Sequence, residues 1–457
     1  MRKQGKLAIA VTLALVSGAV LAQENPLAAD LNQPPPVQAI PLFDYAIGLG
    51  VGHTDNVNRS ATDEASQSVL QPAFNFMVNK QGSTLQAQIV GLLRYTDYLQ
   101  GYYGNEFRGQ LTGTVNWVIS PQRLNFVLQD YSSVEPVNTR VSNSPINQQQ
   151  VNVFNAGPTL LFRLGSSGTW NGQADLRYIN TAASKNKEFA SQRGLAALRL
   201  LHDVSPTSRV SFNLEGVHVD YNNVDPLIAA NRYDQYNLYV RLQRSLQRVD
   251  FDLALGGSRV EFSQGWQSHS GGLARASLAW RMDPRNTLQL TGLYQISDAT
   301  TNLTQPPELA AAAAQLTNPT FLVGRTVISS ALFRDRSISA GYQYQGPRFG
   351  FTLSPYYTRL VQLNGNSLSR DGYGTIAGIT YLINPVTSFG VTVGSQTSKY
   401  PSDGSRDRDD SATVNLLRQL NPHWDLNLAL RHEHRDSSQP SLGYTQNEVF
   451  VYLYYRR

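Results

Sequence analysis

Thr84-Leu-Gln-Ala-Gln-Ile-Val-Gly-Leu-Leu-Arg-Tyr95 alternates between two sets of side chains along its whole length. One set is almost entirely apolar and includes Leu85, Ile89 and Leu93, whereas Gln86 and Arg94 belong to the other. A β-strand imposes this period of two, because successive side chains point to opposite faces of the sheet. Strands of soluble sandwiches are usually about five or six residues long. A stretch of about twice that length predicts a strand that crosses a membrane.

The same pattern recurs along the chain and ends with Glu448-Val-Phe-Val-Tyr-Leu-Tyr-Tyr455. Tight turns such as 120–122 and 421–423 alternate with longer polar loops such as 53–64 and 135–149. Short connections on one side and long ones on the other are typical of outer-membrane barrels. We therefore predict an all-β fold, an antiparallel transmembrane β-barrel of about 20 strands with short periplasmic turns and long extracellular loops. A barrel of about 18 strands is the alternative.

The composition agrees with a barrel. Charged residues make up 16% of the chain, compared with about 25% in a typical soluble domain. The mean hydropathy of −0.31 is nevertheless too polar for a helical membrane protein. A barrel reconciles these values, because half of each strand faces lipid and half faces water. The chain has no cysteine, which excludes disulfides and thiolate metal sites.

The N-terminus predicts export from the cytoplasm. Arg2, Lys3 and Lys6 precede an apolar run that closes on Val20-Leu21-Ala22, so we expect residues 1–22 to be a signal peptide. A retained membrane anchor is the alternative, but the run is shorter than the ~20 residues a span needs. Residues 23–40 contain three consecutive prolines and are predicted to form an extended periplasmic linker, with the barrel over 41–457. Without residues 1–22, 35 of the 38 basic residues face 33 acidic ones.

The longest predicted connection is an extracellular loop over residues 297–334, and we also place the segment from Val327 to Arg336 in a loop. It contains Pro306-Pro307-Glu308-Leu309 followed by five alanines, a local helix signal. Connections longer than about 15 residues are often lids or binding loops. Two alternatives stay open at this point: the loop folds into the pore, or it is a mobile surface excursion. The first strand is predicted over Leu42 to Gly52.

The alternation also predicts which side chains line the lumen. A charge on the lipid face near the midplane costs about 2 to 4 kcal/mol, so we assign the strand arginines to the inner face. Asp175, Glu215, Asp250, Asp252 and Asp425 share that face, which makes a paired network one interpretation and an anion-selecting basic path the other. The candidate lumen-lining residues are Arg94, Arg108, Arg163, Arg177, Arg193, Arg199, Arg241, Arg275, Arg281, Arg431, Tyr239 and Gln110.

No motif indicates an enzyme, a cofactor site or nucleic-acid binding. His432-Glu433-His434 would place two imidazoles on one face, as in a metal ligand pair. Beside Arg431 and Arg435, however, we interpret this tripeptide as the solvated edge of a loop. Asp403, Asp407, Asp409 and Asp410 are interleaved with Arg406 and Arg408, which favours mutual neutralisation over binding of calcium or lipopolysaccharide cations. We expect no catalytic activity and no bound metal.

Both ends of the predicted barrel carry a family resemblance. Tyr45-Ala-Ile-Gly-Leu-Gly-Val-Gly-His-Thr-Asp55-Asn56-Val57 and Tyr444-Thr-Gln-Asn-Glu-Val-Phe-Val-Tyr-Leu-Tyr-Tyr455 resemble the outer-membrane β-barrel proteins of exopolysaccharide and capsule operons. One departure is that Arg456-Arg457 follow Tyr455, where assembly signals usually end on an aromatic residue. The resemblance implies an integral protein of a Gram-negative outer membrane that exports a polysaccharide received from periplasmic partners.

Three functions remain open on the sequence. The leading hypothesis is a conduit for an exopolysaccharide or capsular polysaccharide, contacted by luminal Arg, Gln, Asn and Tyr side chains. The second is a general diffusion porin for small polar solutes, and the third is a non-conducting barrel whose loops bind a surface partner. In each case the expected surroundings are outer-membrane lipid and lipopolysaccharide.

Overall fold

The computed structural model describes residues 42–165, 168–224, 230–263, 265–304 and 326–456. The predicted signal peptide, the linker over 23–40 and the alanine-rich helix near 306–314 lie outside these residues. In the described part of the chain, no helix is both long and apolar enough to span a membrane.

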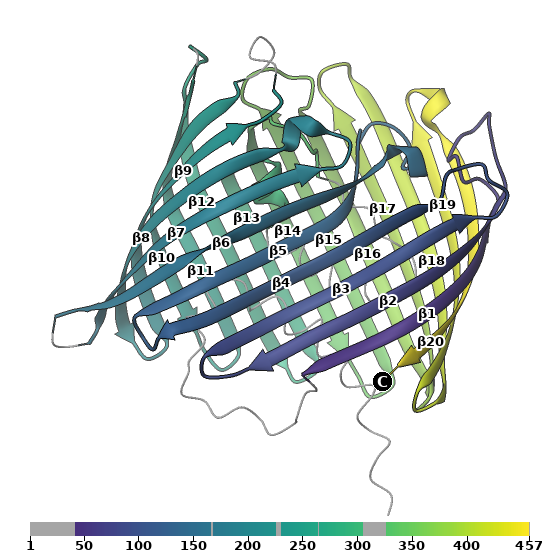
Figure 1. Ribbon diagram of the computed structural model, residues 1–457, viewed down its shortest axis with the longest axis horizontal. Coiled ribbons are helices and arrows are strands. Elements are labelled where there is room, and N and C mark those ends of the chain that lie inside the picture. Colours follow the sequence, from purple (N-terminus) through teal and green to yellow (C-terminus); the bar gives the residue numbers. More distant parts are fainter. Residues whose placement is uncertain (1–41, 166–167, 225–229, 264, 305–325, 457) are drawn as a thin grey trace, which may run out of the picture.

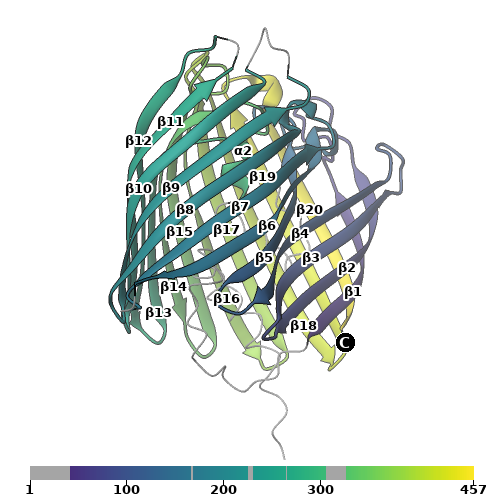
Figure 2. The same cartoon turned by 60° about the vertical axis from the view of Figure 1, so that its left-hand side comes forward.

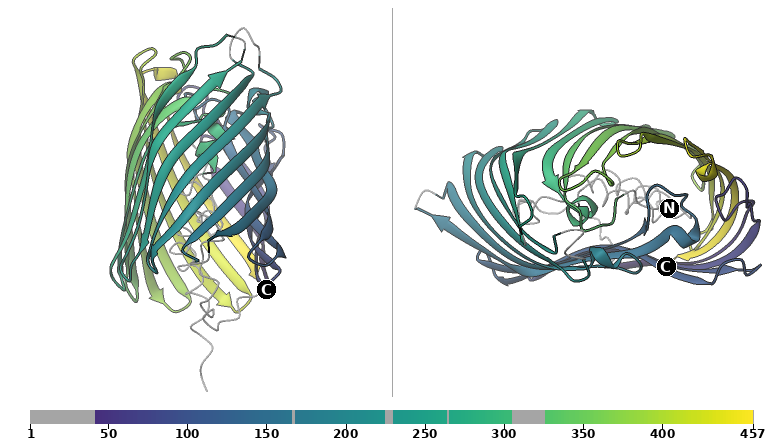
Figure 3. Two further views of the ribbon diagram at one scale, coloured as in Figure 1. Left: turned by 90° about the vertical axis from the view of Figure 1, so that its left-hand side faces the viewer. Right: turned by 90° about the horizontal axis from the view of Figure 1, so that it is seen from above.

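The described residues form one closed sheet of 20 antiparallel strands, and Figures 1 and 3 show the resulting barrel. Each strand pairs with its neighbours in sequence, and β1 pairs with β20 to close the ring. The predicted fold and strand number are therefore confirmed, and the alternative of 18 is wrong. The strands are β1 (Phe43–Thr54), β2 (Gln67–Gln81), β3 (Leu85–Tyr98), β4 (Glu106–Ser120), β5 (Leu124–Pro136), β6 (Gln148–Leu164), β7 (Trp170–Ala183), β8 (Ser191–Ser205), β9 (Ser208–Tyr221), β10 (Arg232–Ser245), β11 (Val249–Phe262), β12 (His269–Asp283), β13 (Asn286–Ser297), β14 (Phe333–Gln345), β15 (Phe349–Gln362), β16 (Arg370–Asn384), β17 (Thr387–Tyr400), β18 (Ser405–Asn421), β19 (Trp424–Ser437) and β20 (Tyr444–Arg456).

Short turns join the strands at one end of the barrel, as between β8 and β9, and most connections at the other end are longer. In the described parts of those longer connections there are four short helices: η1 (Pro145–Asn147), η2 (Lys187–Phe189), α2 (Ala299–Leu303) and η3 (Pro440–Leu442). One predicted boundary was wrong: residues 333–336 belong to β14, so the longest connection covers 298–332. There Phe333 is buried and Arg334 continues the ladder opposite Ile296.

The outer surface of the barrel is apolar at every second position. Leu176 and Tyr178 are 59% and 48% exposed, and Phe212, Leu214, Leu238 and Leu255 are exposed in the same way on later strands. Exposed aliphatic side chains in an alternating pattern would be unfavourable in water but are the expected surface of a barrel in lipid. Aromatic residues such as Trp117 and Trp280 stand near strand ends, where rings favour the headgroup level.

Glycines and aromatic rings shape the joint between β1 and β20. Gly48, Gly50 and Gly52 occupy alternate positions of β1, opposite Tyr454, Tyr452 and Phe450 of β20. A Cβ atom on these glycines would come within 2.3, 2.2 and 2.1 Å of those rings, respectively. The rings therefore lie over the bare backbone of β1, a device that also shields strand glycines. The opening and closing strands are complementary in shape.

The same rings continue into the inner wall. Tyr452 stacks between Phe450 and Tyr454, with ring centroids 5.7 Å apart in both pairs. Its hydroxyl donates to Gln71 of β2. The guanidinium of Arg94 on β3 lies 5.8 Å from the Tyr452 ring centroid, within range of a cation–π interaction. The closure thus connects β20 to three strands on the far side of the joint.

We predict that Gly50→Val weakens this closure. The new side chain collides with the Tyr452 ring, and overpacking of this kind costs about 1 to 3 kcal/mol. The measurement is urea unfolding of the refolded barrel in lipid vesicles, followed by loss of the fast-migrating folded band on a gel. Gly292→Val is the matched control, because a Cβ there meets nothing within 4 Å. Equal midpoints for the two variants would contradict the proposed role of the glycine.

Candidate functional site

The structure places all twelve predicted lumen-lining residues at inner-face positions. Arg177, for example, lies between the exposed Leu176 and Tyr178, and Tyr239 lies between the exposed Leu238 and Val240. Several are almost completely buried by their neighbours, Arg94 at 3% and Gln110 at 4% exposure. Their role in transport stays a prediction, but their environment decides between the two sequence interpretations of the inner charges.

A continuous ion network links β7 to β10. The carboxylate of Asp175 pairs with Arg177 at 3.0 Å and with Arg199 of the next strand. Arg199 also reaches Glu215 of β9 at 3.3 Å, and the Tyr239 hydroxyl donates to the same carboxylate at 2.7 Å. Each of these groups has a partner of opposite charge or a hydrogen bond. This part of the wall is a neutral polar surface.

The remaining predicted arginines are held in similar ways. Arg108, Arg241, Arg281 and Arg431 form ion pairs with Glu106, Asp252, Asp250 and Glu433, respectively. Arg275 donates to Gln295 at 2.7 Å, and Arg163 donates to Gln122 at 3.2 Å. For the arginines that meet carboxylates, the geometry supports the paired network, whereas Arg275 and Arg163 bond to neutral amides.

The described ends of the 298–332 connection fold into the barrel, as the view from above in Figure 3 shows for α2. Asp298 caps α2 by accepting from the Thr301 N–H at 2.9 Å. It also pairs with Arg193 of β8 and accepts a hydrogen bond from the Tyr233 hydroxyl of β10 at 3.2 Å. Figure 2 labels α2 against the neighbouring strands. Of the two alternatives for this loop, its described ends show the inward one.

Apolar contacts hold the same connection. Ala299, Leu303 and Ile328 are buried in one cluster with wall residues. The Asn186 side-chain amide donates to the Ile328 carbonyl and so ties the returning segment to the β7–β8 loop. The wall residues of this cluster are Tyr131, Val151, Val153, Ala183 and Phe189. An interior hydrophobic core is thus built on the luminal side of β5 to β8.

The charge of Asp298 is favoured despite its burial. Burial acts to raise the pKa of this carboxyl, but the Arg193 guanidinium and the hydrogen bonds from Thr301 outweigh it and hold the pKa below the ordinary 3.8. A depressed carboxyl pKa contributes stability at neutral pH that is lost as the pH falls through the folded-state value. The ion pair between Asp298 and Arg193, which anchors the long connection to the wall, is therefore fully formed at physiological pH.

A second loop, residues 137–147 between β5 and β6, also reaches across the inside. The Tyr400 hydroxyl of β17 donates to the Thr139 carbonyl at 3.2 Å. Arg140 pairs with Asp403 at 2.9 Å, and its guanidinium lies 4.4 Å from the Tyr400 ring centroid. These contacts connect β5 and β6 to strands that lie more than 250 residues later in the chain. We refer to residues 137–147 as the luminal strap.

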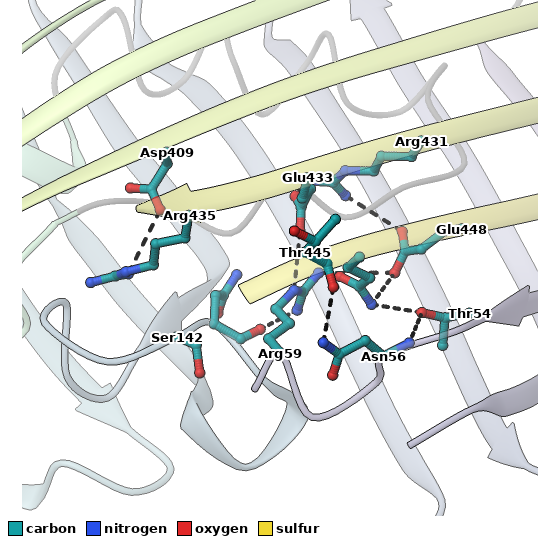
Figure 4. A network of polar contacts seen from close by, with 12 residues as sticks. Thr54, Asn56, Arg59, Ser142, Asp409, Arg431, Glu433, Arg435, Thr445 and Glu448 are labelled. Atoms are coloured by element: carbon teal, nitrogen blue, oxygen red, sulfur yellow. Dashed lines mark hydrogen bonds and ion pairs between the residues drawn. The ribbon is translucent and has the colours of Figure 1, made fainter. Parts of the chain in front are cut away.

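Two arginines hold the strap by its backbone, and Figure 4 shows them. Arg435 of β19 donates to the Arg140 carbonyl at 2.8 Å and pairs with Asp407 at 2.7 Å. Arg59, from the β1–β2 loop, donates to the Asn143 carbonyl and pairs with Glu433 at 3.1 Å. Burial opposes the charge of Arg59, but Glu433 keeps the Arg59 pKa above its ordinary value. We call Arg59 and Arg435 the carbonyl clamp.

One interpretation of the sequence was wrong here. His432-Glu433-His434 with its neighbouring arginines is not a solvated loop edge, because Arg435 is 6% exposed and Glu433 pairs with Arg59 of the carbonyl clamp. Only the two histidines are exposed, and they bond to Asn447 at 2.8 Å and Thr445 at 3.0 Å on β20. Among the described residues, no group of three or more His, Asp or Glu side chains could hold a metal ion.

The acidic cluster divides between two faces. Asp407 and Asp409 turn inward and pair with Arg435, at 2.7 and 3.7 Å, whereas Asp410 pairs with Arg408 at 3.0 Å. Asp403 holds Arg140 of the strap, and hydrogen bonds from Ser405 keep the Asp403 pKa below its ordinary value. The predicted neutralisation by the interleaved arginines is therefore confirmed for Asp410, whereas Asp403, Asp407 and Asp409 pair with arginines outside the cluster.

We predict that Arg59→Met with Arg435→Met releases the strap. The strap loses the two guanidinium donors to its carbonyls, and removing one partner of a buried ion pair costs about 3 to 5 kcal/mol. The measurement is trypsin cleavage after Arg140, detected by the mass of the new fragments. Arg259→Met is the control, since the Arg259–Glu261 pair is exposed on the outer face. A clamp variant as resistant as the unmodified barrel would contradict this role.

We also predict that Asp298→Asn loosens the longer connection, because Arg193 then keeps a buried charge without a carboxylate. Hydrogen exchange at neutral pH should accelerate in residues 299–304 and 326–332. In the unmodified protein, the same acceleration should appear only below the ordinary carboxyl pKa of 3.8, since the folded-state pKa is lower. Asp283→Asn, in an exposed turn at the opposite end of the barrel, is the control. Unchanged exchange in Asp298→Asn would refute the anchor.

No protein-family model and no curated protein sequence matches the chain. Solved structures similar to it include the FrpB iron transporter of Neisseria meningitidis, with 9% identity, a TM-score of 0.46 and coverage of 91% of this chain and 81% of that one. The ferric enterobactin receptor PfeA of Pseudomonas aeruginosa has 9% identity, a TM-score of 0.47 and coverage of 91% and 80%. The outer membrane protein OpdK of P. aeruginosa has 9% identity, a TM-score of 0.38 and coverage of 91% and 99%. Values this low carry no inference about what this chain transports.

Proposed function

We propose that the chain is an integral outer-membrane barrel of a Gram-negative bacterium and that it conducts polar molecules along its axis. The observation that carries the proposal is the inner wall, where charged groups are paired and polar side chains face inward on a ring of 20 strands. A barrel of this size is too wide for wall side chains alone to fill, so the interior holds water, inward loops or both. The apolar outer face fits the membrane.

The paired charges favour a neutral, hydroxyl-rich solute over a strongly acidic one. Asp175 is shared between two arginines, and Glu215 is shared between Arg199 and Tyr239, so neither sign of charge dominates there. Half-buried amide side chains such as Gln129 and Asn171 add donors and acceptors to the inner face. Hydroxyl groups of sugars can exchange hydrogen bonds with such a surface without displacing an ion pair.

Export of a polysaccharide is the finer proposal. It rests on the resemblance of the first and last strands to barrels of exopolysaccharide and capsule operons, and it requires no bond-breaking chemistry. In this proposal an extended glycan, delivered by periplasmic partners, passes between the strap and the opposite wall.

The luminal strap favours a second candidate, a diffusion porin for small polar solutes. A loop that crosses the interior at a fixed place, held by the carbonyl clamp, would act as a constriction. Porin and exporter then differ in whether the strap stays in place while the solute passes.

We predict that refolded protein forms steady channels in a planar bilayer and that neutral and acidic oligosaccharides of equal length block them to a similar degree. Because the inner charges are paired, the affinities should agree within about threefold, which is less than 1 kcal/mol. Releasing the strap with Arg59→Met and Arg435→Met should increase conductance. A long oligosaccharide that blocks only the released variant identifies a porin, whereas block of the unmodified barrel supports export. An absence of current in both would refute a conduit.

A further inference from the structure

The barrel wall is incompletely paired between β4 and β5, which lie side by side (Figure 2). Their register begins at the short turn and ends at Leu111↔Ser132. Above that point, β4 continues over 106–110 opposite β3 alone, and β5 continues over 133–136 opposite β6 alone. The upper part of this boundary therefore has no strand-to-strand ladder, unlike the neighbouring β3–β4 and β5–β6 boundaries.

Side chains bridge the unpaired part. Arg108 of β4 donates to the Pro145 carbonyl of the luminal strap at 3.2 Å. Gln150 of β6 accepts from the Gly109 N–H at 3.2 Å and donates to the Gly109 carbonyl at 2.6 Å. The same Nε2 lies 2.7 Å from the Ser132 hydroxyl oxygen and 3.0 Å from the Ser133 carbonyl oxygen, so its two hydrogens are shared among three acceptors. A side-chain amide thus takes the place of the missing backbone ladder. A rotation of Gln150 would break all four contacts, which a backbone ladder does not allow.

The outer face at this boundary carries a carboxylate between the aromatic residues of the wall. Asp130 has the same parity as Phe126, which faces outward opposite the exposed Trp117, and Asp130 itself lies opposite Gly113. Gly113 lies between the exposed aromatics Phe107 and Trp117 of β4, so the carboxylate lies within the lipid-facing band. A charge there is unfavourable unless it has a use. The outward polar residues at this boundary are Asp130, Ser132, Gln150 and Asn152, with Asn152 donating to Asp130 at 2.9 Å.

An apolar groove of about 700 Å³ runs along the outer wall beside these polar residues. Its lining residue Ala156 on β6 is one outward position from Phe154, the partner of Asp130. Small residues such as Gly194, Ala196 and Gly216 form its floor. A polar site next to a groove of this kind matches a molecule with a polar head and an alkyl chain.

We propose that the upper β4–β5 boundary is a lateral opening through which an amphipathic molecule with a hydroxyl-rich head passes between the lumen and the surrounding leaflet, with Gln150 as its latch. The hydroxyl, amide and carboxylate groups of the polar residues contact the head, and the groove receives the alkyl chain. This route goes beyond axial conduction and does not require it.

The chain has no cysteine, so single reporter thiols test the route directly. Thr112→Cys lies on the inner face of β4 next to the last paired rung. The control Thr413→Cys lies on the inner face of β18, which is paired at this level with both of its neighbours, whereas the β12–β13 register also stops early, at Ala274↔Tyr294. Both positions are half-buried threonines. Refolded variants in vesicles are treated with N-dodecylmaleimide, which partitions into the bilayer, or with water-soluble N-ethylmaleimide. The rate at which each maleimide labels the cysteine is measured by following the mass of the adduct over time.

The expected result is that N-dodecylmaleimide labels Thr112→Cys at least roughly tenfold faster than Thr413→Cys, after each rate is divided by that for N-ethylmaleimide. Adding Gln150→Ala should raise the Thr112→Cys rate by roughly a further tenfold, the effect of losing about one net hydrogen bond. Equal normalised rates at the two positions, or labelling of neither, would overturn the opening. A rate unaffected by Gln150→Ala would overturn the latch. None of these results depends on whether the barrel conducts ions.

Competition tests the class of molecule. Dodecyl β-glucoside below its micelle concentration should slow labelling of Thr112→Cys several-fold, whereas dodecane should not. In the Asp130→Leu background the glucoside should lose this effect while labelling continues. If glucoside and dodecane act alike, the boundary has no preference for a hydroxyl-rich head, and that part of the proposal is wrong.

Discussion

In lipid, every backbone N–H and C=O group must find a partner within the protein. A sheet of alternating side chains meets this condition only if its first and last strands pair, so the joint between β1 and β20 determines whether the rest of the fold exists. Gly48, Gly50 and Gly52 allow the aromatic rings of β20 to lie on the backbone of β1. The joint is therefore specified by shape as well as by hydrogen bonds. The partial ladder between β4 and β5 departs from the same condition and needs the Gln150 side chain to compensate.

Closure leaves a wide interior, and the inner charges are arranged to stabilise loops as well as the wall. Arg193 holds Asp298 of the long connection, and Arg435 holds the strap while paired with Asp407. In each case an arginine on the wall meets both a carboxylate and a loop. Inner charges here serve structure first. A solute that moved along the axis would meet a polar surface with little net charge. This is the basis for proposing a hydroxyl-rich solute.

Much of this architecture could be predicted from local pattern. Long alternating segments gave the barrel, its strand number and the inward parity of residues such as Arg177 and Arg241, because the period of a strand is a property of each segment alone. The inward course of 137–147 could not be predicted, since the partners that hold it lie 84 to 295 residues away and no local signal marks a carbonyl acceptor. The interpretation of residues 432–434 as a loop edge was wrong for a different reason. The two histidines are exposed, but strand parity turns Glu433 between them toward the lumen, where it pairs with Arg59.

The central claim is that the inner charges are paired within a wide conduit, and it is tested most directly by the reversal potential of single channels in a potassium chloride gradient. Paired charges predict steady current and a reversal potential close to zero, because neither ion is favoured. A strong preference for chloride would show that the arginines form a basic path after all. A barrel that carries no current would contradict the conduit itself.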